Sequence, residues 1–254
     1  MHPLKTSYYM VFNNKNPKYF NDEIVLDNVK LQRIGTDAKE TTVKFVGMWI
    51  DENFSWKEHI FKVGNKIRSN LFLIQTNKDI LPKSTRLLMY NTLIKPHLEY
   101  GIAIWGGKLP EKLITLQKRA IRTVAGVRNM RKHTDELFNI LKVLKLKDLF
   151  ELNCAKIAFK AINKLLPNEL LNICEPINHN KCTRSQTQGK VIVPPHKTKV
   201  DECSIFVMAP TTWNNLQDEE TNSPTLSTFS VNLKKKFIST YTNKCEKKNC
   251  YGCR

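Results

Sequence analysis

The spacing of apolar residues changes near residue 55, and this change constrains the fold more than any other feature of the sequence. Before it, apolar runs at residues 8–12, 24–26, 29–34 and 43–50 are separated by polar turns, which is typical of strands. After it, apolar residues recur at intervals of three and four, on one face of a helix; they are Ile60, Val63, Ile67, Leu71 and Ile74. The sequence therefore predicts an α+β fold that is mainly α.

Local signals predict where the first helices begin and end. Ser55, with Glu58 three residues later, predicts a capping box at the start of the first helix. We expect a second helix over residues 84–94, stopped by Pro96, because proline breaks a helix interior. A third is expected over 110–124, with Gly126 as its terminator. Its inward positions are predicted to be Leu113, either Leu116 or Gln117, Ala120 and Val124.

Later segments extend this helical region and then give way to a different composition. Thr134 predicts a cap for a short helix that buries Leu137, Ile140 and Leu141, and a longer helix is expected over residues 146–166. From residue 178 the chain is more polar, with a predicted strand at 203–208 and a last helix starting at Ser223-Pro224. We therefore expect four regions: a β-rich part (1–55), a helical domain (56–177), a small mixed C-terminal domain (178–243) and a basic tail (244–254).

The charge balance favours a polyanionic partner. The chain carries 41 Lys and Arg against 23 Asp and Glu, a net charge of +18, and nucleic acid is the usual partner of such a surplus. The densest cluster of basic residues lies in residues 108–132, where Glu111 is the one acidic residue. Candidate phosphate contacts are Lys118, Arg119 and Arg122 there, and Lys62 and Lys66 on the first helix. The alternative is a charged outer face that keeps the domain in solution.

Several classes of protein are disfavoured. No apolar run approaches the length of a membrane span, and the first residues lack the apolar segment of a signal peptide. Seven cysteines, an odd number, indicate an intracellular, reduced protein of the nucleus or cytoplasm. The Gly-x-Ser-x-Gly elbow and the phosphate-binding loop of nucleotide hydrolases are missing from the sequence.

Two cysteine sets could hold zinc, although each has three ligands where a structural site needs four. The first is the tail set, Cys245, Cys250 and Cys253. The second is Cys174 with His179 and Cys182. Free thiols are the alternative for both sets.

Short motifs along most of the chain resemble, in order, the carboxyl half of reverse transcriptases from non-LTR (LINE-type, jockey-like) retrotransposons. Near the start, Lys5-Thr6 followed by Met10-Val-Phe12 resembles motif D, although His2 stands where the family usually has Asn. Residues 45–51 resemble motif E, the primer grip, and Phe54-Ser-Trp56 resembles the entry to the thumb. Further matches include Leu81-Pro82, Tyr100-Gly101, Trp105-Gly106, Leu116-Gln-Lys118, Thr183-Arg184 and Trp213-Asn214.

The resemblance implies a role for each region of the chain. Residues 1–55 would be the end of the palm, with Lys5 near the triphosphate and Phe45, Gly47 and Met48 in the primer-grip hairpin. The helical domain would be the thumb, which grips a primer–template duplex of RNA and DNA by its backbone. The family uses magnesium, and we expect no cofactor in this chain itself.

The metal-binding Tyr-x-Asp-Asp motif is absent, and we expect it, with the rest of the palm and the fingers, upstream of Met1. Polymerisation by this chain alone is therefore not expected. Three alternatives stay open: a non-enzymatic nucleic-acid-binding protein, a zinc-dependent interaction protein, and an inactive remnant of a mobile element.

Overall fold

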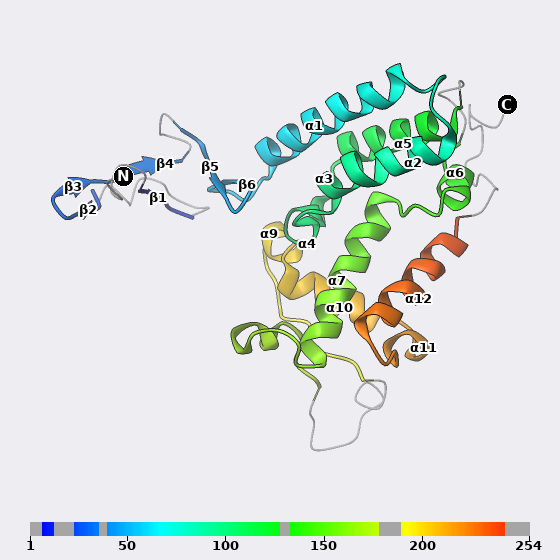
Figure 1. Cartoon of the computed structure of the whole chain (residues 1–254). Coiled ribbons are helices and arrows are strands. Elements are labelled where there is room, and N and C mark those ends of the chain that lie inside the picture. Colours follow the sequence, from blue (N-terminus) through cyan, green and yellow to red (C-terminus); the bar gives the residue numbers. More distant parts are fainter. Residues whose placement is uncertain (1–6, 13–22, 36–39, 128–132, 178–188, 242–254) are drawn as a thin grey trace. The chain divides into compact units, whose positions relative to one another are not determined.

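The computed structural model describes residues 7–12, 23–35, 40–127, 133–177 and 189–241 (Figure 1). Its contacts divide the chain into two units, Met1–Val63 and Gly64–Arg254. The first is built from short strands and the second from helices, so the prediction of a mainly helical α+β protein is confirmed.

The described residues of unit 1 (Met1–Val63) form three two-stranded sheets. Its strands are β1 (Tyr8–Met10), β2 (Val25–Leu26), β3 (Val29–Lys30), β4 (Gln32–Ile34), β5 (Thr42–Phe45) and β6 (Met48–Asp51). β1 pairs with β4 in parallel, while β2–β3 and β5–β6 are antiparallel hairpins. Each predicted segment before residue 51 contains a strand, but two segments are divided. Residues 29–34 form β3 and β4, which belong to different sheets, and residues 43–50 form β5 and β6, which a tight turn separates.

The turn between β6 and helix α1 (Lys57–Thr76) is organised by Asp51. Its carboxylate accepts hydrogen bonds from the backbone N–H of Ser55 (2.9 Å) and Trp56 (3.1 Å), and from the Ser55 hydroxyl (2.9 Å). The Ser55 hydroxyl accepts from the Lys57 N–H at 3.4 Å, so Ser55 contributes to the cap as predicted, but the reciprocal bond predicted for Glu58 is wrong. Because the Ser55 N–H is already bound to Asp51, Glu58 pairs instead with Lys62 at 3.3 Å.

The named elements in the described part of unit 2 (Gly64–Arg254) are all helices, joined by turns and loops, and α1 continues into this unit from unit 1. Its elements after α1 are α2 (Lys83–Met89), the π-helix η3 (Tyr90–Ile94), α3 (Lys95–Glu99), α4 (Ile102–Trp105), the 3-10 helix η4 (Gly106–Lys108), α5 (Glu111–Ala125), α6 (Asp135–Ile140), α7 (Leu146–Ile162), the 3-10 helix η5 (Asn168–Cys174), α9 (Lys199–Glu202), α10 (Ile205–Asn214), α11 (Asp218–Thr221) and α12 (Leu226–Ser239).

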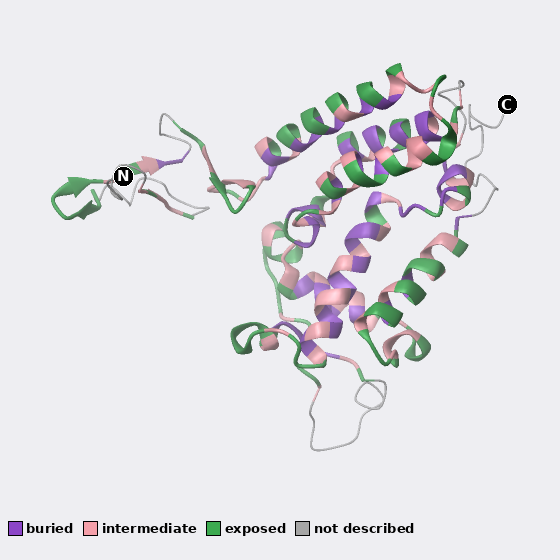
Figure 2. Ribbon diagram, in the orientation of Figure 1, coloured by how far each residue is buried: buried purple, intermediate pink, exposed green. Residues whose placement is uncertain are grey.

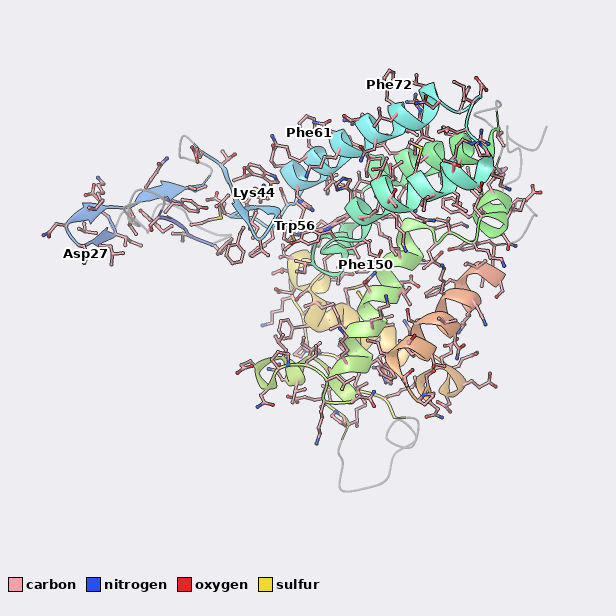
Figure 3. The ribbon with its side chains drawn as sticks, in the orientation of Figure 1. Asp27, Lys44, Trp56, Phe61, Phe72 and Phe150 are labelled. Carbon is pink, nitrogen blue, oxygen red and sulfur yellow. The ribbon has the colours of Figure 1, made fainter. Side chains whose placement is uncertain are left out.

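Helix α7 is the centre of unit 2, in contact with α3, α4, α5, α10 and α12. Figure 2 shows buried positions running along α5 and α7. Phe159 of α7 stacks on Phe229 of α12, with ring centroids 4.9 Å apart, and Trp213 of α10 lies 6.1 Å from Phe229. Phe150 of α7 (Figure 3) packs so closely on η4 that a Cβ added at Gly106 would lie 2.7 Å from its ring.

The prediction that a helix stops at Pro96 is wrong. The chain passes from α2 through the π-helical turn η3 into α3, which contains Pro96 in its first turn. A π turn has hydrogen bonds five residues apart, and the Lys95 N–H accordingly donates to the Tyr90 carbonyl. Pro96 is tolerated because a proline in the first turn of a helical segment loses no hydrogen bond.

The expected strand at residues 203–208 is also wrong. Ser204 caps helix α10, accepting a hydrogen bond from the Phe206 N–H at 3.4 Å, and the apolar run after it is helical. A short apolar run does not distinguish a strand from a buried helix. Between residues 199 and 239 the elements are therefore the helices α9 to α12, whereas residues 189–198 form no helix and Val191 makes a β-bridge with Pro176. Since α10 and α12 pack on α7, the segments before and after residue 178 share one core.

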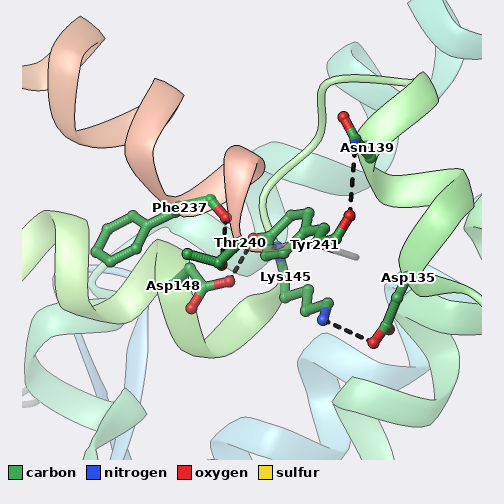
Figure 4. Close-up of polar contacts among 7 residues, drawn as sticks. All are labelled: Asp135, Asn139, Lys145, Asp148, Phe237, Thr240 and Tyr241. Atoms are coloured by element: carbon green, nitrogen blue, oxygen red, sulfur yellow. Dashed lines mark hydrogen bonds and ion pairs between the residues drawn. The ribbon is translucent and has the colours of Figure 1, made fainter. Parts of the chain in front are cut away.

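Tyr241 ties the segment after α12 to the start of α7 (Figure 4). Its hydroxyl accepts a hydrogen bond from the Lys145 N–H (3.0 Å) and donates one to Asp148, whose pKa is raised above its usual value by burial. Lys145 lies 4.4 Å over the Tyr241 ring and pairs with Asp135 at 3.1 Å. Beside this network, α6 buries Leu137 as predicted, but Ile140 is exposed, contrary to the prediction.

Candidate nucleic-acid interface

Helix α5 carries four cations on the side that faces away from the core. Its buried side consists of Leu113, Leu116, Gln117, Ala120, Ile121, Thr123 and Val124, so both residues of the predicted Leu116 or Gln117 alternative are buried. The α5 basic face comprises Lys112, Lys118, Arg119 and Arg122; the first three are exposed and Arg122 is half-buried. Spacings of three, four and seven residues place them on one side of a helix, as predicted for Lys118 and Arg122.

The guanidinium of Arg119 is positioned by a side-chain relay. Its Nη2 donates to Gln75 Oε1 at 3.3 Å, and Gln75 Nε2 donates to the Thr123 hydroxyl at 3.4 Å. Partial burial lowers the pKa of Arg122, and a guanidinium stays protonated at neutral pH. The relay joins the end of α1 to α5 and leaves the charged groups at the surface.

Gln117 holds α5 in this orientation from the buried side. Its Nε2 donates to the Tyr90 hydroxyl (3.1 Å) and to the Leu144 carbonyl (2.9 Å), and its Oε1 accepts from the Leu146 N–H (2.9 Å). The last bond supplies an acceptor to one of the N–H groups that open α7. Burial raises the pKa of Tyr90 to about 12, so its hydroxyl stays neutral.

The first-helix candidates Lys62 and Lys66 differ in their surroundings. Lys62 pairs with Glu58 at 3.3 Å and lies 5.2 Å over the Trp49 ring, so its charge is engaged within unit 1. Lys66, in unit 2, is exposed; burial lowers the pKa of His97, and the nearby charge of Lys66 lowers it further. Phe72 also projects outward from α1 (Figure 3) and is 66% exposed.

The hairpin that resembles a primer grip presents its turn to solvent. Phe45 is 63% exposed and Val46 65% exposed, while Met48 is half-buried. The two turn residues Val46 and Gly47 have φ angles of 44° and 79°, the signs that a type I′ turn requires. Phe45, Gly47 and Met48 therefore lie together at one end of the hairpin, with Phe45 opposite Met48.

The remaining predicted site residues lie outside the described residues. They are Lys5 and the tail cysteines Cys245, Cys250 and Cys253, together with His179 and Cys182 of the second cysteine set. Cys174 of that set is described; it is buried, which raises its thiol pKa to about 12 and holds it protonated.

We searched the described part of the chain for side chains that could bind magnesium together. There, no three His, Cys, Asp or Glu side chains come together in a group that could hold a metal ion.

Sequence reasoning missed two cations beside the C-terminal end of α5. Arg86 of α2 donates from Nε to the Val124 carbonyl at 3.1 Å and from Nη1 to the Lys78 carbonyl. Lys78 and Arg86 line a hollow of about 640 Å³ together with Gln75, Asp79, Thr123, Ala125, Gly126 and Val127. No sequence signal connects these residues, because they come from three separate segments.

Comparisons with known proteins give no match: none of the family models, curated proteins or solved structures is similar to this chain. Across the described residues, no helix combines the length and the apolar character that crossing a membrane requires.

Proposed function

We propose that this chain is part of a non-LTR retrotransposon reverse transcriptase and binds a primer–template duplex of RNA and DNA through the sugar–phosphate backbone. The observation that carries the proposal is the α5 basic face, in which Lys112, Lys118, Arg119 and Arg122 share one surface. The ordered sequence resemblance supplies the family, and the net charge of +18 supports a polyanionic partner.

The size of the α5 basic face suits contact with several phosphates. Lys112 and Arg122 are ten residues apart, a rise of about 15 Å along the helix. Phosphates recur about every 3.4 Å along the axis for each strand, so this length spans about four of them. Cations spaced along a helix in this way bind the backbone without reading bases.

The β5–β6 hairpin supports the likeness to a primer grip. Phe45 and Val46 expose apolar surface at a tight turn, where a neighbouring sugar could pack against them. In the proposed enzyme this turn would contact the end of the primer strand. The chain contains no Tyr-x-Asp-Asp motif, so we expect it to bind the duplex without extending the primer.

A salt titration of binding to a labelled RNA–DNA hybrid tests the proposal. Affinity should fall steeply with salt, because each phosphate contact releases counterions and contributes about 0.9 to the slope of log K against log salt. Replacing Lys118, Arg119 and Arg122 together by Ala should flatten this slope by about 2 to 3 and weaken all sequences alike, about tenfold or more.

A matched control carries the same loss of charge elsewhere in unit 2: Lys197, Lys199 and Lys235, all exposed, changed together to Ala. The control should reduce affinity far less than the α5 variant. Thermal unfolding of both variants checks that each is folded. Binding that does not change between low and moderate salt, or equal losses in the two variants, contradicts the proposal.

A further inference from the structure

The hollow at the end of α5 is bounded by a fixed guanidinium. Arg86 is held by its bonds to the Val124 carbonyl (3.1 Å) and the Lys78 carbonyl, which leave its Nη2 turned toward Gly126. An arginine whose plane is already fixed loses little conformational freedom on binding an oxyanion. We call the space lined by these residues the α5 hollow.

Glycine at position 126 keeps the α5 hollow open. Gly126 ends α5 with a φ of 73°, which favours glycine, and a Cβ there would lie 3.2 Å from Arg86 Nη2. The hollow is about 640 Å³, enough for a phosphate with an attached sugar. The termination of α5 and the access to Arg86 therefore depend on the same residue.

The charge of the lining favours an anion. Lys78 and Arg86 contribute two cations and Asp79 one carboxylate. Gln75 donates one N–H to the Thr123 hydroxyl at 3.4 Å, and the charged donors that a ligand would meet are Lys78 and Arg86. A guanidinium binds phosphate oxygens in charge-assisted hydrogen bonds.

The α5 hollow is continuous with the α5 basic face. Thr123 and Gln75 line the hollow, and Gln75 also holds the guanidinium of Arg119 at 3.3 Å. A backbone that follows Lys118 and Arg119 therefore reaches the rim of the hollow at the next turn of the helix. We propose that the α5 hollow binds one phosphate of the polynucleotide that lies on the α5 basic face, which makes this inference dependent on the proposed function.

Two adjacent residues of opposite charge provide the test, with the full chain and the same labelled hybrid. Lys78→Gln removes a donor and should weaken binding about 3- to 10-fold, with a salt slope shallower by about 0.9. Asp79→Asn removes a repulsive charge and should tighten binding about 2-fold. Arg86 itself is left intact, because its loss would free two backbone carbonyls.

The controls make the same charge changes outside the hollow, at exposed positions: Lys83→Gln and Asp201→Asn. The proposal is supported if Lys78→Gln weakens binding and Asp79→Asn tightens it, each by more than its control variant does. Effects equal to those of the controls, or weaker binding by Asp79→Asn, overturn it. If the hollow variants match their controls while the α5 triple variant loses affinity, this inference alone fails; a wild-type chain without salt-sensitive binding removes the proposed function as well.

Discussion

At the scale of single residues, Gln117 is a buried polar side chain that joins three segments of unit 2. It is 2% exposed, and its amide bonds to groups 27 and 29 positions away. Neither interval is visible in the spacing of apolar residues, which left Leu116 and Gln117 as alternatives for one inward position. Both are buried, because α5 is covered on a broad side by several helices.

Gln117→Leu should therefore lower the free energy of unfolding, because the added apolar burial of leucine does not offset the lost hydrogen bonds. It leaves the Leu146 N–H, the Leu144 carbonyl and the Tyr90 hydroxyl without this partner. Each buried group left without a partner costs about 1–3 kcal/mol, so the free energy of unfolding should fall by about 3 kcal/mol. Urea unfolding measures the change as a lower midpoint at constant m-value.

The matched control is Gln75→Leu: Gln75 is half-buried and its partner Arg119 is exposed, while its buried partner Thr123 keeps a hydrogen bond to the Arg119 carbonyl at 3.0 Å. This loss should cost less than about 1 kcal/mol, since water can replace a partner at the surface. Equal losses in the two variants would show that Gln117 does not organise the start of α7.

At the scale of elements, the β2–β3 and β5–β6 hairpins both have tight turns with positive φ angles, but different residues occupy those positions. The β2–β3 turn places Asp27 and Asn28 (Asp27 is labelled in Figure 3) at φ angles of 48° and 61°. The β5–β6 turn places Val46 at 44°. Asp and Asn tolerate positive φ, whereas a β-branched residue is strained there. The β5–β6 turn therefore stores strain at the tip that is proposed to meet the primer.

Val46→Asn should relieve this strain and stabilise the hairpin by about 1 kcal/mol. Amide hydrogen exchange of β5 and β6 should slow about fivefold, because 1.4 kcal/mol corresponds to a factor of ten. The reverse change at the other hairpin, Asp27→Val, should speed exchange in β2 and β3. Unchanged exchange in both variants would mean that Val46 carries no strain.

The elements that could be predicted from the sequence are those specified by near neighbours. The β5–β6 hairpin and the α5 basic face follow from alternation and from spacings of three and four residues. The π turn before Pro96, the capping of the α1 entry by Asp51 and the helical state of residues 205–208 depend on competition between local signals. The α5 hollow could not be predicted, because its lining comes from three segments.

At the scale of the whole molecule, the two units differ in how much apolar surface they bury. Within the described residues of unit 1, the buried hydrophobic side chains are Ile34, Trp56 and Val63. Its strands leave many others exposed, namely Tyr8, Val25, Leu26, Val29 and Phe45. Unit 2 instead has an extended core around α7. A parallel strand pair such as β1–β4 is normally covered on both faces, and the described strands of unit 1 have few buried apolar contacts that would resist opening.

The two units should therefore open separately. Native-state hydrogen exchange in low denaturant measures the free energy of local opening. This free energy should be at least about 2 kcal/mol lower for the β5–β6 amides than for those of α7, because local stability follows buried apolar contact. The openings of α7 should have the larger denaturant dependence, since they expose the core shared with α10 and α12. Phe229→Ala, which removes a ring stacked 4.9 Å from Phe159, should lower the α7 opening free energy by about 3–5 kcal/mol and leave β5–β6 unchanged. If Phe229→Ala destabilises both regions equally, the chain unfolds as one cooperative body, and the small core of unit 1 does not set its stability.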